Sequence, residues 1–323
     1  MTIPAELKRL AKFILTTACL VAACGPADRA GRAPDGAVNA VATTSMIADL
    51  LRQIGAEHVE VTGLMGPGVD PHLYQASAGD VTRMSEADVI FYNGLHLEGK
   101  MVNVFEQMHR RNIRAVAVAE TAVPDGELIE SPAFQGNYDP HVWFDVSLWM
   151  QVAETVHDVL AEMDPENATN FQTNLQAYQD ELSSLDAYIR EKTAELPENR
   201  RVLITSHDAF GYFGRAYGFE VYGLQGISTA AEAGTADVQA LVELVVQRRI
   251  PALFIESSVS PKGIEAVREA VRSRGFDVSI GGTLYGDALG NPETPAGTYA
   301  GMIRHNIDTI VSSLQGNHVA AAR

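Results

Sequence analysis

The chain has 323 residues, which is enough for two domains of ordinary size, each with its own core. Hydrophobic residues make up 46% and charged residues 20% of the chain, as in globular proteins, so wholesale disorder is excluded. Twenty-four basic against 41 acidic residues give a net charge of -17. Because so acidic a surface repels polyanions, we expect no binding to nucleic acid.

The N-terminus has the pattern of a targeting segment. A short basic stretch is followed by an apolar run from Phe13 to Ala23, which is too short to span a bilayer. The run ends in Val-Ala-Ala-Cys24, which resembles a bacterial lipobox. In that pattern the chain is cleaved before the cysteine, which is then acylated. We therefore expect residues 1–23 to be a lipoprotein signal peptide and Cys24 to carry a lipid anchor; an ordinary signal peptide with a chance cysteine is the alternative.

The segment after Cys24 and the cysteine count support this interpretation. Residues 24–37 are small, polar and rich in proline and glycine, which predicts a flexible tether. The second cysteine, Cys19, lies inside the signal peptide. The mature chain would then have no disulfide, and a metal site in it could use no thiolate.

Strand-like and helix-like segments alternate from Val38 onward. The predicted strands are 38–44, 59–64, 88–92, 114–119, 202–205, 220–222, 252–255 and 276–280. Such alternation is typical of parallel sheets with helices on both faces. We therefore predict an α/β fold with two lobes, each a mostly parallel four-stranded sheet flanked by helices. The lobes would span residues 38–164 and 198–315, with 316–323 as a tail.

The segment 165–197 between the two lobes has a helical pattern. Its apolar positions follow one another at spacings of 4, 3, 4, 3 and 4, at Phe171, Leu175, Tyr178, Leu182, Leu185 and Ile189. A helix of about 30 residues would be roughly 45 Å long, longer than one small lobe. We interpret it as a rigid connecting helix along both lobes; an ordinary surface helix within one lobe is the alternative.

The tripeptide Asp-Pro-His occurs twice, ending at His72 and at His141, both times in loop-like sequence. A third histidine, His207, follows an apolar, strand-like run. In doubly wound sheets, ligands bind beyond the carboxyl ends of strands. Imidazole is a common metal ligand, and a carboxylate adds charge neutralisation. The pattern predicts a metal site in the cleft between the two lobes.

The carboxylate of this site is left open by spacing alone, because Asp208, Glu256 and Asp287 all follow strand-like segments. Asp208 could instead cap a helix that begins directly after it. Asp70 and Asp139, within the two tripeptides, are better suited to shaping the turns or to orienting an imidazole by accepting its N–H. The remaining histidines lack such loop chemistry and are interpreted as structural: His58, His96, His109, His157, His305 and His318.

Five segments in this order resemble one known family, and the resemblance runs from about Val38 to Leu314. They are Gly68-Val-Asp-Pro-His-Leu-Tyr74, Asp139-Pro-His-Val-Trp143, Ser206-His-Asp-Ala-Phe-Gly-Tyr-Phe213, Glu256-Ser-Ser-Val-Ser-Pro-Lys262 and Gly286-Asp-Ala-Leu-Gly290. Together they are similar to the TroA-like solute-binding lipoproteins of zinc/manganese ABC importers.

The resemblance implies two α/β lobes joined by one long helix, with the metal held between them. By motif position, the family's four ligands fall on His72, His141, His207 and Asp287. It also implies a monomeric, extracytoplasmic receptor without catalytic activity, which binds one Zn²⁺ or Mn²⁺ and delivers it to a membrane permease and its ATPase.

Two features bear on the metal. The zinc-specialised branch of the family carries a histidine-rich loop ahead of its second ligand, but residues 123–138 contain no histidine. The manganese-specialised branch has glutamate where this chain has His207. Nitrogen-rich ligation favours Zn²⁺ over Mn²⁺, whereas a bidentate Asp287 would permit the five-coordination that Mn²⁺ tolerates. A further departure is Val146, where the family often has proline.

Two other classes of protein remain as alternatives. A zinc hydrolase keeps three protein ligands and an open position for water, but four ligands would close that position. The motifs His-Glu-x-x-His and Gly-x-Ser-x-Gly are also absent from the chain. A lipid-anchored surface adhesin is the second alternative, although no residue pattern supports it directly.

Overall fold

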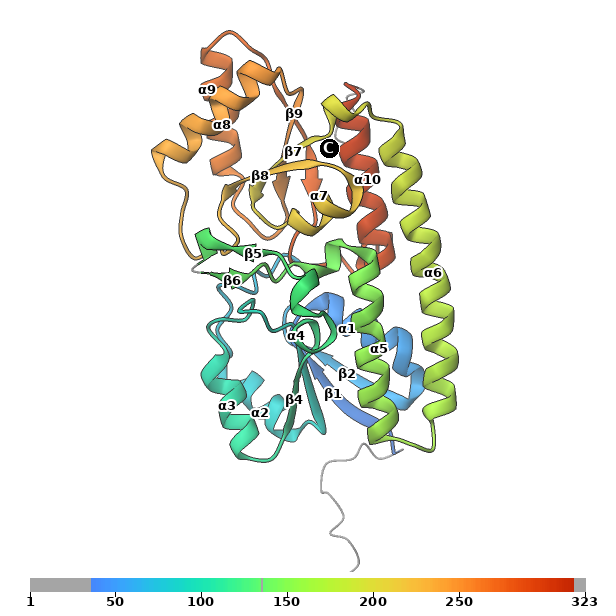
Figure 1. The fold of residues 1–323 in the computed structure, drawn as a ribbon. Coiled ribbons are helices and arrows are strands. Elements are labelled where there is room, and N and C mark those ends of the chain that lie inside the picture. The colour runs from blue at the N-terminus through green and yellow to red at the C-terminus, as the bar shows by residue number, and fades with distance from the viewer. Residues whose placement is uncertain (1–35, 135, 317–323) are drawn as a thin grey trace, which may run out of the picture. The chain divides into compact units, whose positions relative to one another are not determined.

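The computed structural model describes residues 36–134 and 136–316 (Figure 1). The predicted signal peptide, Cys24 and nearly all of the tether and of the tail lie outside the described residues, so these assignments stay predictions. Within the described part of the chain, no helix is both long enough and apolar enough to cross a membrane. The lobe boundaries at residues 164 and 198 also stay predictions.

The first half contains a four-stranded parallel sheet, as predicted, in the order β2–β1–β3–β4. Its strands are β1 (Val38–Ala42), β2 (Val59–Gly63), β3 (Val89–Tyr92) and β4 (Arg114–Ala117). The helices between and after them are α1 (Ser45–Gly55), α2 (Ala78–Glu86), α3 (Val102–Arg110), α4 (Val118–Ala122) and α5 (Val146–Met163). Strand β4 ends two residues earlier than predicted, because the buried residues Val118 and Ala119 begin α4.

The second half contains four strands that pair in two parallel ladders, β7 with β8 and β9 with β10. Its elements are β7 (Val202–His207), α7 (Gly211–Tyr217), β8 (Glu220–Gln225), α8 (Thr235–Arg248), β9 (Ala252–Glu256), α9 (Lys262–Ser273), β10 (Ser279–Leu284) and α10 (Tyr299–Leu314). Strands β7 and β9 are in contact, but no ladder joins them, unlike in the continuous sheet that we predicted. At their contact, the N–H of His207 donates to the side chain of Glu256 rather than to a strand carbonyl.

Strand β10 lies later in the chain than the predicted strand 276–280. A Gly-Gly pair in a sequence is typical of a turn, but Gly281 and Gly282 both lie within β10. A Cβ on Gly281 would lie 2.8 Å from the Cβ of Ser313, and one on Gly282 would lie 2.6 Å from Cγ2 of Thr309. The two glycines therefore let helix α10 pack closely on the last strand, just before the chain reaches Asp287.

Helix α6 (Ala168–Ala194) is the predicted long helix, at 27 residues. All six apolar positions of the predicted stripe are buried. The helix runs beside both α5 and α10 (Figure 1), and its buried side chains belong to one core with residues of both halves. Such a shared core holds the two halves together along this helix.

Short elements complete the described chain. Within the segment 123–138, β5 (Glu130–Ser131) and β6 (Asn137–Tyr138) form a small antiparallel hairpin. The 3-10 helices are Ala56–His58, Asp125–Glu127, Pro132–Phe134, Val142–Phe144, Glu198–Arg200 and Pro295–Gly297.

Candidate metal centre

The four predicted ligands lie at the ends of strands or in the segments that follow them. His72 lies in the loop after β2, and His141 follows β6. His207 is the last residue of β7, and Asp287 lies three residues beyond the end of β10. One ligand atom from each residue lies within 4.8 Å of those of the other three, and all four side chains are buried. Strand ends far apart in sequence thus bring together the four residues that the sequence indicated.

The histidines converge on the carboxylate through their Nε2 atoms. The Nε2 atoms of His141 and His207 lie 3.3 and 3.2 Å from oxygens of Asp287, and that of His72 lies 3.7 Å away. The Nε2 atoms of His72 and His141 are 3.3 Å apart. Ligand atoms arranged tetrahedrally at about 2.0–2.1 Å from a zinc ion lie roughly 3.3–3.4 Å from one another. Three of these four distances match the spacing around a tetrahedral ion, and the one from His72 to Asp287 is slightly longer.

The carboxylate of Asp287 has an unusual environment for a buried charge. Neither of its oxygens accepts a hydrogen bond of proper geometry from the described residues, and Nε2 of His207 also lacks such a partner. A buried ionised carboxylate without hydrogen bonds is costly unless a cation neutralises it. The proximity of three imidazoles and the lack of aligned hydrogen bonds together fit the demands of a bound divalent cation.

Two further carboxylates lie close to the Nδ1 atoms of His141 and His207. Nδ1 of His141 lies 2.6 Å from Oδ1 of Asp139, and Nδ1 of His207 lies 2.8 Å from Oε2 of Glu256. A carboxylate that accepts the N–H of Nδ1 holds Nε2 free for a metal. Gly286 makes room for this arrangement, since a Cβ there would overlap with Oε2 of Glu256. Asp139 is hydrogen-bonded to His141 in this way, whereas Glu256 and His207 form an ion pair without hydrogen-bond geometry.

Asp70 and Asp208 behave differently from Asp139 and Glu256. Asp70 shapes its turn, because Oδ1 accepts the backbone N–H of His72 at 2.8 Å. Its Oδ2 accepts a hydrogen bond of 2.6 Å from the hydroxyl of Thr229. The alternative in which Asp208 caps a helix starting directly after it is wrong, because α7 begins at Gly211 and its N-cap is Phe210.

Burial and neighbouring charges shift the pKa values of the four residues in different directions. Burial lowers the pKa of His72 to about 3, so its ring is neutral. Burial also lowers the pKa of His141, but Asp139 and Asp287 outweigh it and raise the pKa to about 9. His207 follows the same pattern, since Glu256 and Asp287 raise its pKa well above the usual value against the effect of burial. Asp287 keeps its charge, because the two histidinium rings outweigh burial and lower its pKa.

Three aromatic residues, to which the sequence analysis assigned no role, donate hydrogen bonds to backbone carbonyls around the site. The indole of Trp143 donates a hydrogen bond of 3.1 Å to the carbonyl of Gly286, directly before Asp287. The hydroxyl of Tyr299 donates to the carbonyl of Trp143 at 2.7 Å, and that of Tyr212 donates to the carbonyl of Asp139 at 2.9 Å. The one available signal was the aromatic residue two positions after each Asp-Pro-His, which does not reveal its partner.

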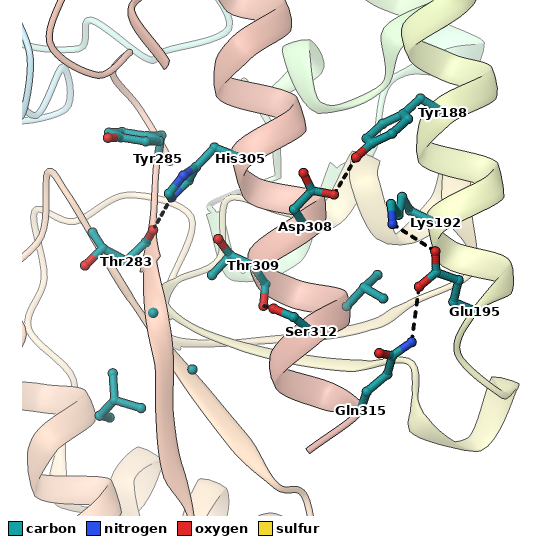
Figure 2. A pocket seen from close by; sticks show the side chains of 14 residues that line it. Tyr188, Lys192, Glu195, Thr283, Tyr285, His305, Asp308, Thr309, Ser312 and Gln315 are labelled. Atoms are coloured by element: carbon teal, nitrogen blue, oxygen red, sulfur yellow. Dashed lines mark hydrogen bonds and ion pairs between the residues drawn. The ribbon is translucent and has the colours of Figure 1, made fainter. Parts of the chain in front are cut away.

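The site is distinct from a large open groove elsewhere in the molecule. Figure 2 shows this groove, which has a volume of about 790 Å³ and lies between α6, α10 and β10. Hydrogen bonds such as those of Tyr188 to Asp308 and of His305 to the carbonyl of Thr283 cross or line it. None of the four predicted ligands lies in this groove. The candidate metal centre is instead enclosed.

Comparison with known proteins identifies relatives along almost the whole described chain. Residues 40–313 match the family described as "Zinc-uptake complex component A periplasmic", or ZnuA. The zinc-binding protein TroA of Treponema pallidum is 51% identical over 87% of this chain and 90% of its own length. The solved structure of that protein, periplasmic zinc-binding protein TroA, superposes with a TM-score of 0.84 over 86% of this chain and 99% of its own.

One further relative is named for manganese binding, and another is named as part of a metal ABC transporter. The manganese-binding lipoprotein MntA of Bacillus subtilis is 48% identical over 90% of this chain and 94% of its own length. The metal ABC transporter substrate-binding lipoprotein SsaB of Streptococcus sanguinis is 29% identical over 94% of this chain and 97% of its own length. The family match and the identities above 30% over most of both chains lead to one conclusion: this chain belongs to the ZnuA family.

Proposed function

We propose that the protein is the substrate-binding component of an ABC importer for a divalent transition metal, Zn²⁺ or Mn²⁺. It binds one ion per chain and delivers it to a membrane permease that works with an ATPase. The observation that carries this proposal is the convergence of three buried imidazole Nε2 atoms on the carboxylate of Asp287. Relatives named for zinc, manganese and metal ABC transport support the class of substrate.

The ligands that we propose are His72, His141, His207 and Asp287. Three neutral imidazoles and one carboxylate leave a divalent site with a net charge of +1, which the carboxylates of Asp139 and Glu256 behind the rings reduce further. Such a set is compatible with tetrahedral Zn²⁺, and a bidentate carboxylate would extend it to five ligands for Mn²⁺. The ion is cargo in this proposal, held for transfer rather than for chemistry.

The protein is a solute-binding protein and not an enzyme. A hydrolytic zinc site keeps one coordination position open for water. Here four protein groups converge, and the side chains of all four are at most 4% exposed. Substrate-binding lipoproteins among the relatives support an extracytoplasmic location, and we propose Cys24 as the site of the lipid anchor and a monomer as the working form.

Metal content and calorimetry test this proposal. Protein purified from its native envelope should contain about one Zn²⁺ or Mn²⁺ per chain by elemental analysis, and competition between the two ions identifies the preferred one. His207→Ala should weaken binding of Zn²⁺ by more than roughly a hundredfold, since it removes a ligand and not only a neighbour of one. The matched control is His109→Ala, which removes an exposed imidazole from α3. Unchanged calorimetric binding in His207→Ala would contradict the proposed ligand set.

A further inference from the structure

One side chain that holds no metal connects the two halves next to the candidate centre. Thr229 lies in the loop between β8 and α8, residues 226–234. Thr229 is 7% exposed, whereas the next two residues, Ala230 and Ala231, are exposed. Its hydroxyl donates a hydrogen bond of 2.6 Å to Oδ2 of Asp70, which is 159 residues away in sequence. This loop is thus tied to the first half by a specific bond.

Asp70 also contacts the backbone of a proposed ligand. Its other oxygen, Oδ1, accepts the backbone N–H of His72 at 2.8 Å. One carboxylate therefore links the hydroxyl of Thr229 to the turn that positions His72. In the second Asp-Pro-His, Asp139 instead uses its Oδ1 for both the backbone N–H and the imidazole of His141, and its carbonyl accepts the hydroxyl of Tyr212. The two copies of the tripeptide have different tasks.

The same loop of the first half meets the second half at another point. Gly68 has a φ of +71°, and a Cβ there would lie 3.3 Å from the carbonyl oxygen of Ser257, which follows β9. The loop with Gly68, Asp70 and His72 therefore lies directly against the second half. Because the proposed ligands are enclosed, an ion can leave only if segments around the site move apart, and this loop and the second half are two such segments.

We propose that the hydrogen bond between Thr229 and Asp70 is a latch that slows the release of the bound metal. This inference rests on the proposed function, since it presupposes a metal at the four ligands. A hydrogen bond to an ionised carboxylate is among the stronger ones in proteins. Opening of the site must break it, whereas an ion that enters an open site meets no formed latch. Thr229 is a positioning residue that controls the dissociation rate and not the association rate.

Stopped-flow release of Zn²⁺ to a colorimetric chelator tests the latch with the full mature chain. Thr229→Val keeps the shape of the side chain and removes the hydroxyl, and we expect dissociation to become on the order of tenfold faster or more. Thr229→Ala removes the hydroxyl without adding a methyl group in its place and serves if the valine variant does not fold. Thr229→Ser should restore slow release. The matched control is Thr235→Val, an exposed threonine at the start of α8.

The outcomes separate the latch from the proposed function. Faster dissociation with an association rate within about twofold of wild type, and rescue by serine, would support the latch. A wild-type chain that binds one Zn²⁺ together with unchanged release from Thr229→Val and Thr229→Ala would refute the latch and leave the proposed function intact. Equal acceleration in Thr235→Val would also refute it, because the effect would then not depend on this hydrogen bond. A wild-type chain that binds no metal would overturn both.

Discussion

Metal binding should release protons, and their number follows from the pKa values in the site. His72 is already neutral, because burial lowers its pKa to about 3, and Asp287 is already ionised. His141 has a pKa of about 9 and is therefore protonated at pH 7 without a metal; the pKa of His207 is raised as well. A metal needs the neutral form of each ring, so we expect two protons to leave at pH 7, one from each of these histidines.

The size of the pH effect can be worked out for His141. Its pKa lies about two units above pH 7, so removal of its proton at that pH costs about 3 kcal/mol. The apparent association constant should therefore rise about tenfold per pH unit for this proton alone, and more steeply while His207 also titrates. The sign is fixed by the direction of the shifts: raised imidazole pKa values weaken binding as the pH falls.

Calorimetry can count these protons directly. Zn²⁺ titrations at pH 7 in two buffers with different enthalpies of ionisation give the number of protons released from the slope of the observed enthalpy. Chelator competition between pH 6 and pH 8 gives the change in affinity independently. A release of no protons, together with an affinity that does not change over this range, would refute the assignment of His141 and His207 as charged rings in the metal-free site.

Two further predictions concern one orienting residue and the long helix. Asp139→Asn removes one of the two charges that raise the pKa of His141, so we expect the calorimetric proton count to fall. We expect the affinity to fall by about ten- to hundredfold, because loss of the partner that orients the ring outweighs the easier removal of the proton; an unchanged proton count would argue against this charge as a cause of the raised pKa. Leu185→Ala should lower the free energy of unfolding by about 2–5 kcal/mol in urea denaturation, because Leu185 is fully buried in α6, whereas Ser184→Ala on the exposed face should have little effect. Equal losses in the two helix variants would contradict the buried stripe.

Periodicity and local chemistry predicted those parts of the fold that local interactions determine. The spacing of Leu182, Leu185 and Ile189 indicated a helix because a single face of it is buried, and that face is the one in contact with the core. The last strand could not be placed from local pattern. Gly281 and Gly282 are in the strand because α10 packs against them, and this contact depends on residues that follow some 30 positions later.

The candidate site shows the same limit. The two Asp-Pro-His tripeptides and His207 stand out by local sequence, but three carboxylates were equally placed by spacing. Only tertiary contacts distinguish the candidates: Glu256 lies next to Nδ1 of His207, whereas Asp287 lies among the Nε2 atoms. The bond of Thr229 to Asp70 has no local signal at all, because the loop around Thr229 consists mostly of glycine and alanine and carries no recognisable motif.

The fluorescence of Trp143 should report directly on metal binding. Its ring lies 5.1 Å from that of His141, centroid to centroid, and its N–H is bonded to the residue before Asp287. The chain has one other tryptophan, Trp149, which stacks on Tyr299 within the core. Loss of the imidazolium charge beside Trp143, or arrival of a paramagnetic ion such as Mn²⁺, should change its fluorescence. Cargo loading could then be followed in the unlabelled protein, in real time and without a dye.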